Sequence, residues 1–168
     1  MTQVTRPLRE EHQELLPHLT HIQEIADVVG TIPIASLQHE LDETYGFLTH
    51  QLLPHAQAEE RALYPVVGRL LDAPEATATM SRDHVEITRW VEQLGELRSH
   101  LRNERLEVSQ ERALRRVLYG LFALVTAHFA KEEEVYLPLL DSRLTHEEAR
   151  QMFEAMEQAA REAKSVLS

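Results

Sequence analysis

The sequence has no cysteine and only five glycines, and aromatic residues make up 5% of its 168 residues. Without cysteine the chain forms no disulfide bond, iron–sulfur cluster or thiolate-ligated metal site, and a reducing compartment is expected. Any metal ion would therefore be bound by nitrogen and oxygen atoms alone.

Basic residues are also few, since 17 lysines and arginines stand against 28 aspartates and glutamates, giving a net charge of −11. Nucleic acids and anionic membranes attract clusters of Lys and Arg, so neither is expected as a partner. The first residues lack the basic and apolar regions of a signal peptide, and no apolar run approaches the roughly eighteen residues of a membrane span. We expect a cytoplasmic protein with a single domain over residues 1–168.

Strand-like alternation of polar and apolar residues is missing as well, whereas Leu, Ala, Glu, Gln and Arg are abundant and favour helix. Turn signals divide the chain into four long helical segments and a shorter fifth helix, which begins with the capping-box pattern Thr145-His-Glu-Glu148. The expected segments are residues 6–29, 35–70, 76–102, 109–140 and 145–166. Short connections make successive helices antiparallel, so we predict an all-α, up-down-up-down four-helix bundle over about residues 6–140, with a short C-terminal fifth helix.

The most informative pattern is a lone histidine followed by His-x-x-x-Glu, which occurs twice with an offset of about 72 residues. In each copy a proline lies ten residues past the second histidine. Residues four apart share one face of an α-helix, so each His-x-x-x-Glu can direct an imidazole and a carboxylate to the same point. The residues of the pattern are His12, His55, Glu59, His84, His128 and Glu132.

Helical periodicity places all six on faces that otherwise carry apolar residues. The apolar positions that we assign to these faces are Leu8, Leu15, Leu19, Ile22, Ala26, Leu41, Tyr45, Leu48, Leu52, Ala62, Met80, Ile87, Val91, Leu94, Leu114, Val117, Leu121, Leu124 and Val135. A buried ionised carboxylate is strongly disfavoured unless it is paired or binds a metal. Two such carboxylates beside four histidines therefore predict a metal site, and the ligand types suit iron, copper or zinc.

The same geometry directs the six other histidines to solvent: His18, His21, His39, His50, His100 and His146. Glu60 and Glu133 are expected to face water or to support the metal ligands. Most of the acidic residues that flank the lone histidines should be surface charge: Glu10, Glu11, Asp83 and Glu86. Tyr64 is interpreted as a packing residue.

With these residues in hand, the chain resembles the hemerythrin-like proteins that have an HHE cation-binding domain, over about residues 6–140. The resemblance implies a four-helix bundle around two non-heme iron ions. His12 and His55 would then bind one iron and His84 and His128 the other. Glu59 and Glu132 would bridge the two irons.

The chain departs from the respiratory oxygen carriers of that family, because Thr88 stands where they have a second histidine on the third helix. The resemblance thus points to the regulatory branch and implies that the protein binds or reduces dioxygen, hydrogen peroxide or nitric oxide, as a peroxide-detoxifying enzyme or as a sensor. The alternative function is iron storage, iron delivery or the repair of iron centres. A third hypothesis is a metal-free interaction bundle in which the histidines are packing residues. The ligand types also suit manganese or zinc, and the oligomeric state is left open.

Overall fold

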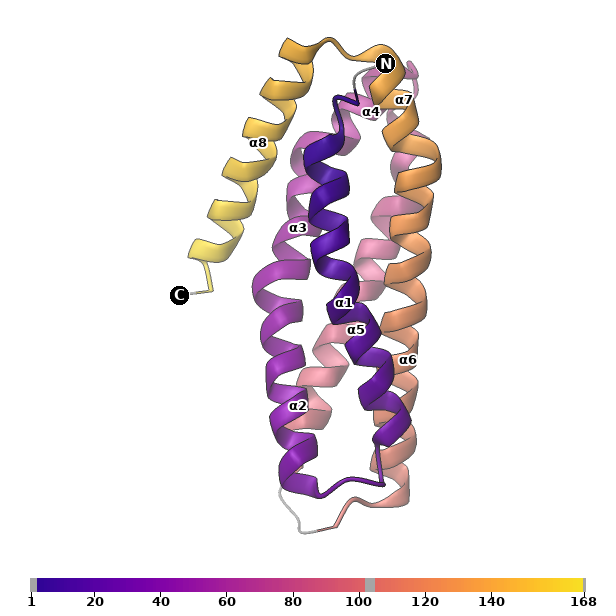
Figure 1. The fold of residues 1–168 in the computed structure, drawn as a ribbon, viewed down its shortest axis with the longest axis vertical. Coiled ribbons are helices and arrows are strands. Elements are labelled where there is room, and N and C mark those ends of the chain that lie inside the picture. The colour runs from indigo at the N-terminus through magenta and orange to yellow at the C-terminus, as the bar shows by residue number, and fades with distance from the viewer. Residues whose placement is uncertain (1–2, 102–104, 168) are drawn as a thin grey trace.

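Helices account for all the regular structure in the computed structural model, which describes residues 3–101 and 105–167 (Figure 1). In chain order the helical elements are α1 (Arg6–Val28), α2 (Ile34–Phe47), η1 (Leu48–Leu52), α3 (Leu53–Ala58), η2 (Glu59–Leu63), α4 (Tyr64–Leu70), η3 (Pro74–Thr77), α5 (Ala78–Ser99), α6 (Val108–Lys131), η4 (Glu132–Tyr136), α7 (Leu137–Arg143) and α8 (His146–Ser165). The expected segments match these elements closely, and residue 102, the end of one of them, lies outside the described residues.

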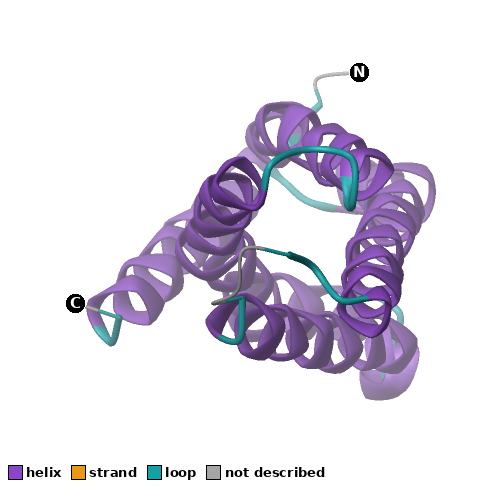
Figure 2. Cartoon of the chain, turned by 90° about the horizontal axis from the view of Figure 1, so that it is seen from below, coloured by secondary structure: helices purple, strands orange, loops and turns teal. Residues whose placement is uncertain are grey.

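Four long helical rods alternate in direction and form the bundle (Figure 1). The rod of α1 packs against α2 and α6, and α5 packs against the same two neighbours from the opposite corner. Figure 2 shows this ring of helices end-on. The fifth helix, α8, lies outside the ring against α3 and η2. The all-α, up-down-up-down bundle with a fifth helix is thereby confirmed.

Three of the short elements, η1, η2 and η4, are π-helical turns inserted into otherwise α-helical rods. Each is followed, two residues after its end, by a proline: Pro54, Pro65 or Pro138. A proline ring presses on the carbonyl four residues earlier, and a wider turn gives that carbonyl room. Glu59 and Glu132 each begin one of these turns. The prolines that recur in the sequence pattern thus account for a local widening of the helix at both glutamates.

The π turns change the side-chain register beyond them, and this explains one wrong core prediction. Val135 lies within η4 and is 58% exposed, although α-helical periodicity placed it in the core. Ala62, at the corresponding position of η2, is buried, because α8 covers that turn. Tyr45 and Leu124 are half-buried, and the other apolar positions assigned to the core are buried.

The apolar core is divided into two clusters, and the predicted metal ligands lie at or next to the boundary between them on every rod. On α1, for example, Leu8 belongs to one cluster and Leu15 to the other, with His12 between them. On the fourth rod, Phe129 and Leu137 mark the same boundary around Glu132. The six polar residues therefore form a layer inside an otherwise apolar bundle.

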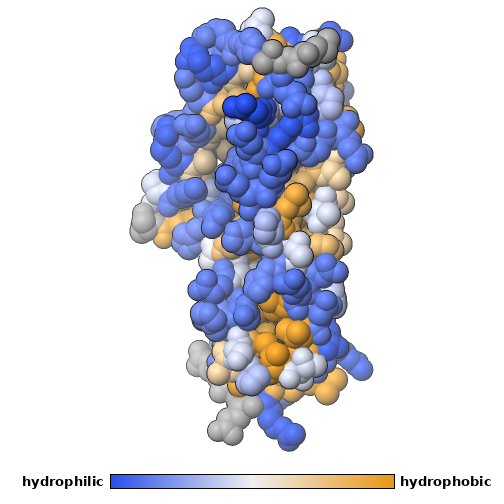
Figure 3. Space-filling model, in the orientation of Figure 1, coloured by the Kyte–Doolittle hydropathy of each residue, from blue (hydrophilic) through white to orange (hydrophobic). Residues whose placement is uncertain are grey.

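The amphipathic α8 closes one side of this structure. Its first residue follows Thr145, whose hydroxyl accepts a hydrogen bond from the Glu148 backbone N–H, so the predicted capping box is confirmed. The inner face of α8 is buried and consists of small or flexible side chains, including Ala149, Met152 and Met156. In the view of Figure 3 hydrophilic side chains cover most of the surface, and apolar ones show mainly between α1 and α2 in the lower half.

One helical run in the described residues, Val108–Arg143, is long and apolar enough to cross a membrane by length and composition. The core helix of a soluble bundle meets the same criteria, and this run packs against α1 and α5 through buried residues such as Leu114 and Leu121. It is therefore weak evidence for a membrane, and the absence of a membrane partner stays a prediction.

Candidate metal centre

All six predicted ligands are buried, with exposed fractions of 8% or less. They come from four rods: His12 from α1, His55 from α3, His84 from α5 and His128 from α6, with Glu59 and Glu132 at the start of η2 and η4. The bundle brings them together in two groups that are each able to hold a metal ion. The two groups meet at Glu59, which belongs to both.

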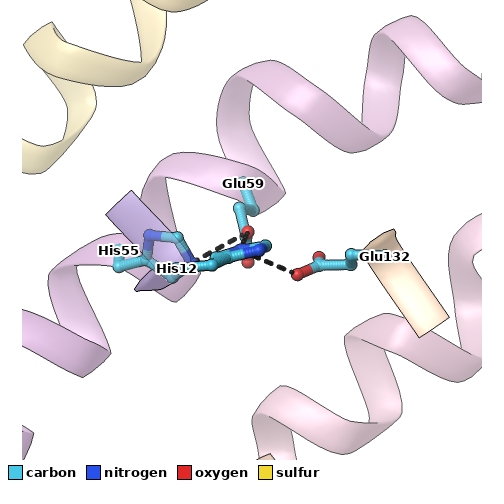
Figure 4. A group of neighbouring side chains, drawn as sticks. All are labelled: His12, His55, Glu59 and Glu132. Carbon is cyan, nitrogen blue, oxygen red and sulfur yellow. Dashed lines mark ion pairs between the residues drawn. The ribbon is translucent and has the colours of Figure 1, made fainter. Parts of the chain in front are cut away.

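The first group consists of His12, His55, Glu59 and Glu132 (Figure 4). The Nε2 atom of His55 lies 3.0 Å from Glu59 Oε1, and His12 Nε2 lies 3.8 Å from the same oxygen. From the facing rod, Glu132 brings Oε2 to within 3.3 Å of His12 Nε2. Two imidazole nitrogens and two carboxylate oxygens thus surround one point.

The second group consists of Glu59, His84 and His128. The other oxygen of Glu59, Oε2, lies 3.3 Å from His84 Nε2 and 3.9 Å from His128 Nε2. The two imidazole nitrogens are 2.9 Å apart. Glu59 therefore presents one oxygen to each group, which is the geometry of a bridging carboxylate.

The chemistry of these atoms fits metal binding. Within the described residues, six buried side-chain atoms of the first group have no hydrogen-bond partner: His12 Nε2, His55 Nε2, Glu59 Oε1, Glu59 Oε2, Glu132 Oε2 and His55 Nδ1. The last of these faces Glu11 and not the other candidate ligands. Buried polar atoms in proteins are normally hydrogen-bonded, because leaving one unpaired costs about 1–3 kcal/mol. Cations that accept electron pairs from the first five of these atoms would remove the cost at each of them.

Each of the four candidate ligand histidines has a carboxylate within 3.0 Å of its Nδ1 atom. The Nδ1 atom of His12 lies 2.8 Å from Glu133 Oε1, and that of His84 lies 2.8 Å from Glu60 Oε1. Both glutamates come from the other copy of the repeat, one residue after its ligand glutamate. Glu133 is itself paired with Arg9. These glutamates were expected to face water or to support the metal ligands, and each of them contacts a candidate ligand histidine.

The other two histidines contact Glu11 and Asp83, two of the four flanking acidic residues of which most were expected to be surface charge. Glu11 Oε1 lies 3.0 Å from His55 Nδ1, and Asp83 Oδ2 lies 3.0 Å from His128 Nδ1. Asp83 also pairs with Lys131. The sequence held a signal for this role, because an acidic residue immediately precedes the lone histidine in both copies.

These supporting carboxylates are expected to set metal affinity. Such a partner fixes the ring orientation of a ligand histidine and makes it more basic, and its loss typically costs about 10–100-fold in affinity. We therefore expect Glu11→Gln and Asp83→Asn to weaken metal binding by about that factor, measured by competition with a chelator. Glu10→Gln, which alters an exposed neighbour paired with Arg6, is the matched control. Equal affinities in all three variants would contradict a supporting role.

The carboxylates also control the charge of the imidazoles in the protein without a cation. Burial lowers the pKa of His12, but the adjacent carboxylates of Glu132 and Glu59 outweigh it and raise the pKa to about 9. The same balance raises the pKa of His128 to about 10. Burial raises the pKa of Glu59, yet the charge of His55 brings it well below its usual value. Protons on the imidazoles thus neutralise the carboxylates in the protein without a cation.

Two aromatic side chains make the surroundings of the two groups different. The ring of Phe129 stacks on His12, with centroids 4.3 Å apart, and covers the first group. Tyr64, which was interpreted as packing, places its hydroxyl within the second group, where it donates a hydrogen bond of 2.9 Å to Glu132 Oε1. Tyr64 also lines a surface cavity of about 530 Å³ together with Glu60, Gly68 and Ser81.

The remaining histidines lie away from the centre. All six are exposed, as the helical geometry predicts. His21, for instance, pairs with Glu40 on the surface. Thr88 is half-buried and donates its hydroxyl hydrogen bond to the His84 carbonyl, so it does not replace the missing imidazole.

Comparison with known proteins gives one match. The family model described as the hemerythrin HHE cation binding domain matches residues 3–140, which include all six candidate ligands and end before α8. No curated protein and no solved structure matches the chain.

Proposed function

The chain belongs to the hemerythrin HHE cation-binding domain family, and from this premise we propose that it is a non-heme di-iron protein that binds or reduces a small oxidant. The oxidant would be dioxygen, hydrogen peroxide or nitric oxide. His12 and His55 would hold one iron, and His84 and His128 the other. Glu59, which belongs to both groups, would bridge them, and Glu132 would bind the first iron, with its Oε1 3.4 Å from His128 Nε2. In this proposal the protein is cytoplasmic, and neither a nucleic acid nor a membrane is its partner.

The observation that carries this proposal is the position of Glu59. Its side chain is fully buried, and its two oxygens belong to two separate groups of imidazoles. A carboxylate that bridges two cations keeps them close together, and paired metals can act on one small molecule. Iron, when bound, supplies the electron transfer that oxidant reduction requires.

The chain's own residues prepare this chemistry in three ways. Supporting carboxylates fix the four imidazole rings, so the nitrogen atoms keep their positions when a ligand enters or leaves. Phe129 and the two apolar clusters keep bulk water from the polar layer, which strengthens every charge interaction inside it. The cavity beside Tyr64 offers a small molecule an approach from the side of the second group.

The test combines metal analysis with turnover. The protein is loaded anaerobically with ferrous iron, and about two irons per chain are expected, with near-ultraviolet absorption after oxidation that changes on addition of azide or peroxide. Steady peroxide or oxygen consumption at constant iron occupancy supports oxidant reduction, and reversible spectral change without consumption supports oxidant binding. Transfer of iron to an apo-acceptor without either response supports storage or delivery and contradicts the proposal. A failure to bind iron also contradicts it.

A further inference from the structure

Two equivalent glutamates of the repeat, Glu133 and Glu60, differ in the side chain that accompanies them. Each lies 2.8 Å from the Nδ1 atom of a lone histidine of the other copy. Glu133 also forms an ion pair with Arg9, which stands three residues before its histidine. At the same position of the other copy stands Ser81, whose hydroxyl donates a hydrogen bond of 2.9 Å to Glu60 Oε2. Among the described residues, no lysine or arginine therefore neutralises Glu60.

Glu60 faces both the solvent and the second group. Its side chain is 36% exposed, and with Tyr64 and Ser81 it lines the surface cavity of about 530 Å³. The Tyr64 hydroxyl lies 3.4 Å from His84 Nε2 and 3.3 Å from His128 Nε2. One cavity thus borders an exposed carboxylate and a side chain that contacts two candidate ligands of the second group.

The charges around this cavity favour a cation. Among the described residues of its lining, Glu60 and Asp72 are acidic and only Arg69 is basic. Glu11, which also has no lysine or arginine partner in the described part of the chain, lines a groove between α1 and α8. Acidic and basic side chains are equal in number in that groove: Glu11, Glu157, Arg161 and Lys164. A surplus of one sign of charge around a cleft raises the local concentration of counter-ions, so a divalent cation is drawn to the cavity at Glu60.

We propose that the cavity at Glu60 is the entrance through which the metal ion of the second group reaches its site, an inference that rests on the proposed metal centre. Glu60 is the first carboxylate that binds the entering divalent cation. The cation then passes along Tyr64 to the imidazole nitrogens of His84 and His128. The other copy of the repeat has no such entrance at the equivalent carboxylate, because Arg9 pairs with it.

The test restores the missing basic residue and measures zinc exchange, which needs no iron chemistry. Uptake of zinc is followed by stopped flow with a zinc-sensitive dye, and release by transfer to an excess of chelator. In Ser81→Arg, uptake of one of the two zinc ions is expected to be about tenfold slower or more. Because a blocked entrance raises the barrier in both directions, release should slow by the same factor and the affinity should stay unchanged. Gln93→Arg, which adds the same charge on an exposed part of α5 outside the cavity, is the matched control.

A second variant tests the charge at the rim without filling the cavity. Asp72→Asn removes one negative charge, and asparagine tolerates the positive φ of 51° at this position. Uptake is expected to be roughly threefold slower at low salt, and the difference should vanish at high salt as the charge is screened. Glu75→Gln is the control, because it removes the same charge from an exposed neighbour that does not line the cavity.

The outcomes separate the entrance from the metal centre. A wild type that binds no zinc would overturn both. Normal zinc binding with equal uptake rates in all four variants would overturn the entrance alone. A lower affinity in Ser81→Arg without slower release, or equal slowing of both uptake phases, would also contradict an entrance that serves the second group.

Discussion

Glu59→Gln is expected to release both metal ions, because Glu59 is the one predicted ligand that the structure places in both groups. The amide keeps the shape of the side chain but removes its negative charge and turns one oxygen into an N–H donor that points at an imidazole or a cation. Removing one partner of a buried charge pair costs about 3–5 kcal/mol, which corresponds to about two to four orders of magnitude in affinity. Metal content should fall from about two ions per chain to near zero after dialysis against a weak chelator.

Glu132→Gln provides the internal comparison. Glu132 lies in the first group only, so this variant should keep about one ion per chain. Glu43→Gln is the matched control, because Glu43 stands four residues after His39 in the same spacing but on an exposed face. Far-ultraviolet circular dichroism of the three variants verifies that each remains helical. Two retained ions in Glu59→Gln, or equal losses in Glu59→Gln and Glu132→Gln, would show that Glu59 does not join the two groups.

Removing the metal from the wild type is expected to lower the melting temperature by roughly 15–30 °C. An ion that binds only the folded state at about 1,000 times its Kd stabilises it by about 4 kcal/mol, so two ions give about 8 kcal/mol. In a chain of this size each kcal/mol shifts the melting temperature by roughly 2–4 °C. The expected cause is that cations would bind buried polar atoms that otherwise have no hydrogen-bond partner in the layer of four imidazoles and two carboxylates.

The measurement is a pair of thermal melts, with and without chelator, followed by readdition of the metal. Readdition should restore the original melting temperature. Glu59→Gln serves as the control, since chelator should not change the melting temperature of a variant that holds no metal. An unchanged melting temperature in the wild type would favour the metal-free bundle, in which the histidines are packing residues.

The helical repeat was readable from the sequence because an α-helix has a fixed angle per residue. That angle placed His12 and His84 on apolar faces and directed His18 and His100 to solvent, and the burial of each agrees. It also identified Glu59 and Glu132 as buried carboxylates. The same rule failed at Val135, because η4 is a π turn with a different angle per residue.

Contacts between the rods could not be predicted from the sequence. Glu11 and Asp83 look like surface charge on their own helices, and they support His55 and His128 only because neighbouring rods bring the pairs together. Their place one residue before the lone histidines was visible, but its meaning depended on which rods are neighbours. The position of α8 against η2 likewise follows from packing.

The sequence by itself determined the class of fold and the identity of six buried polar residues, since both follow from periodicity within single helices. Only the tertiary structure decided how those residues divide into two groups, that Glu59 belongs to both, and that the Tyr64 hydroxyl lies beside His84 and His128. The reason is physical. Side-chain direction within a helix is set by local geometry, whereas distances of a few ångströms between helices depend on how four rods pack and where their turns widen.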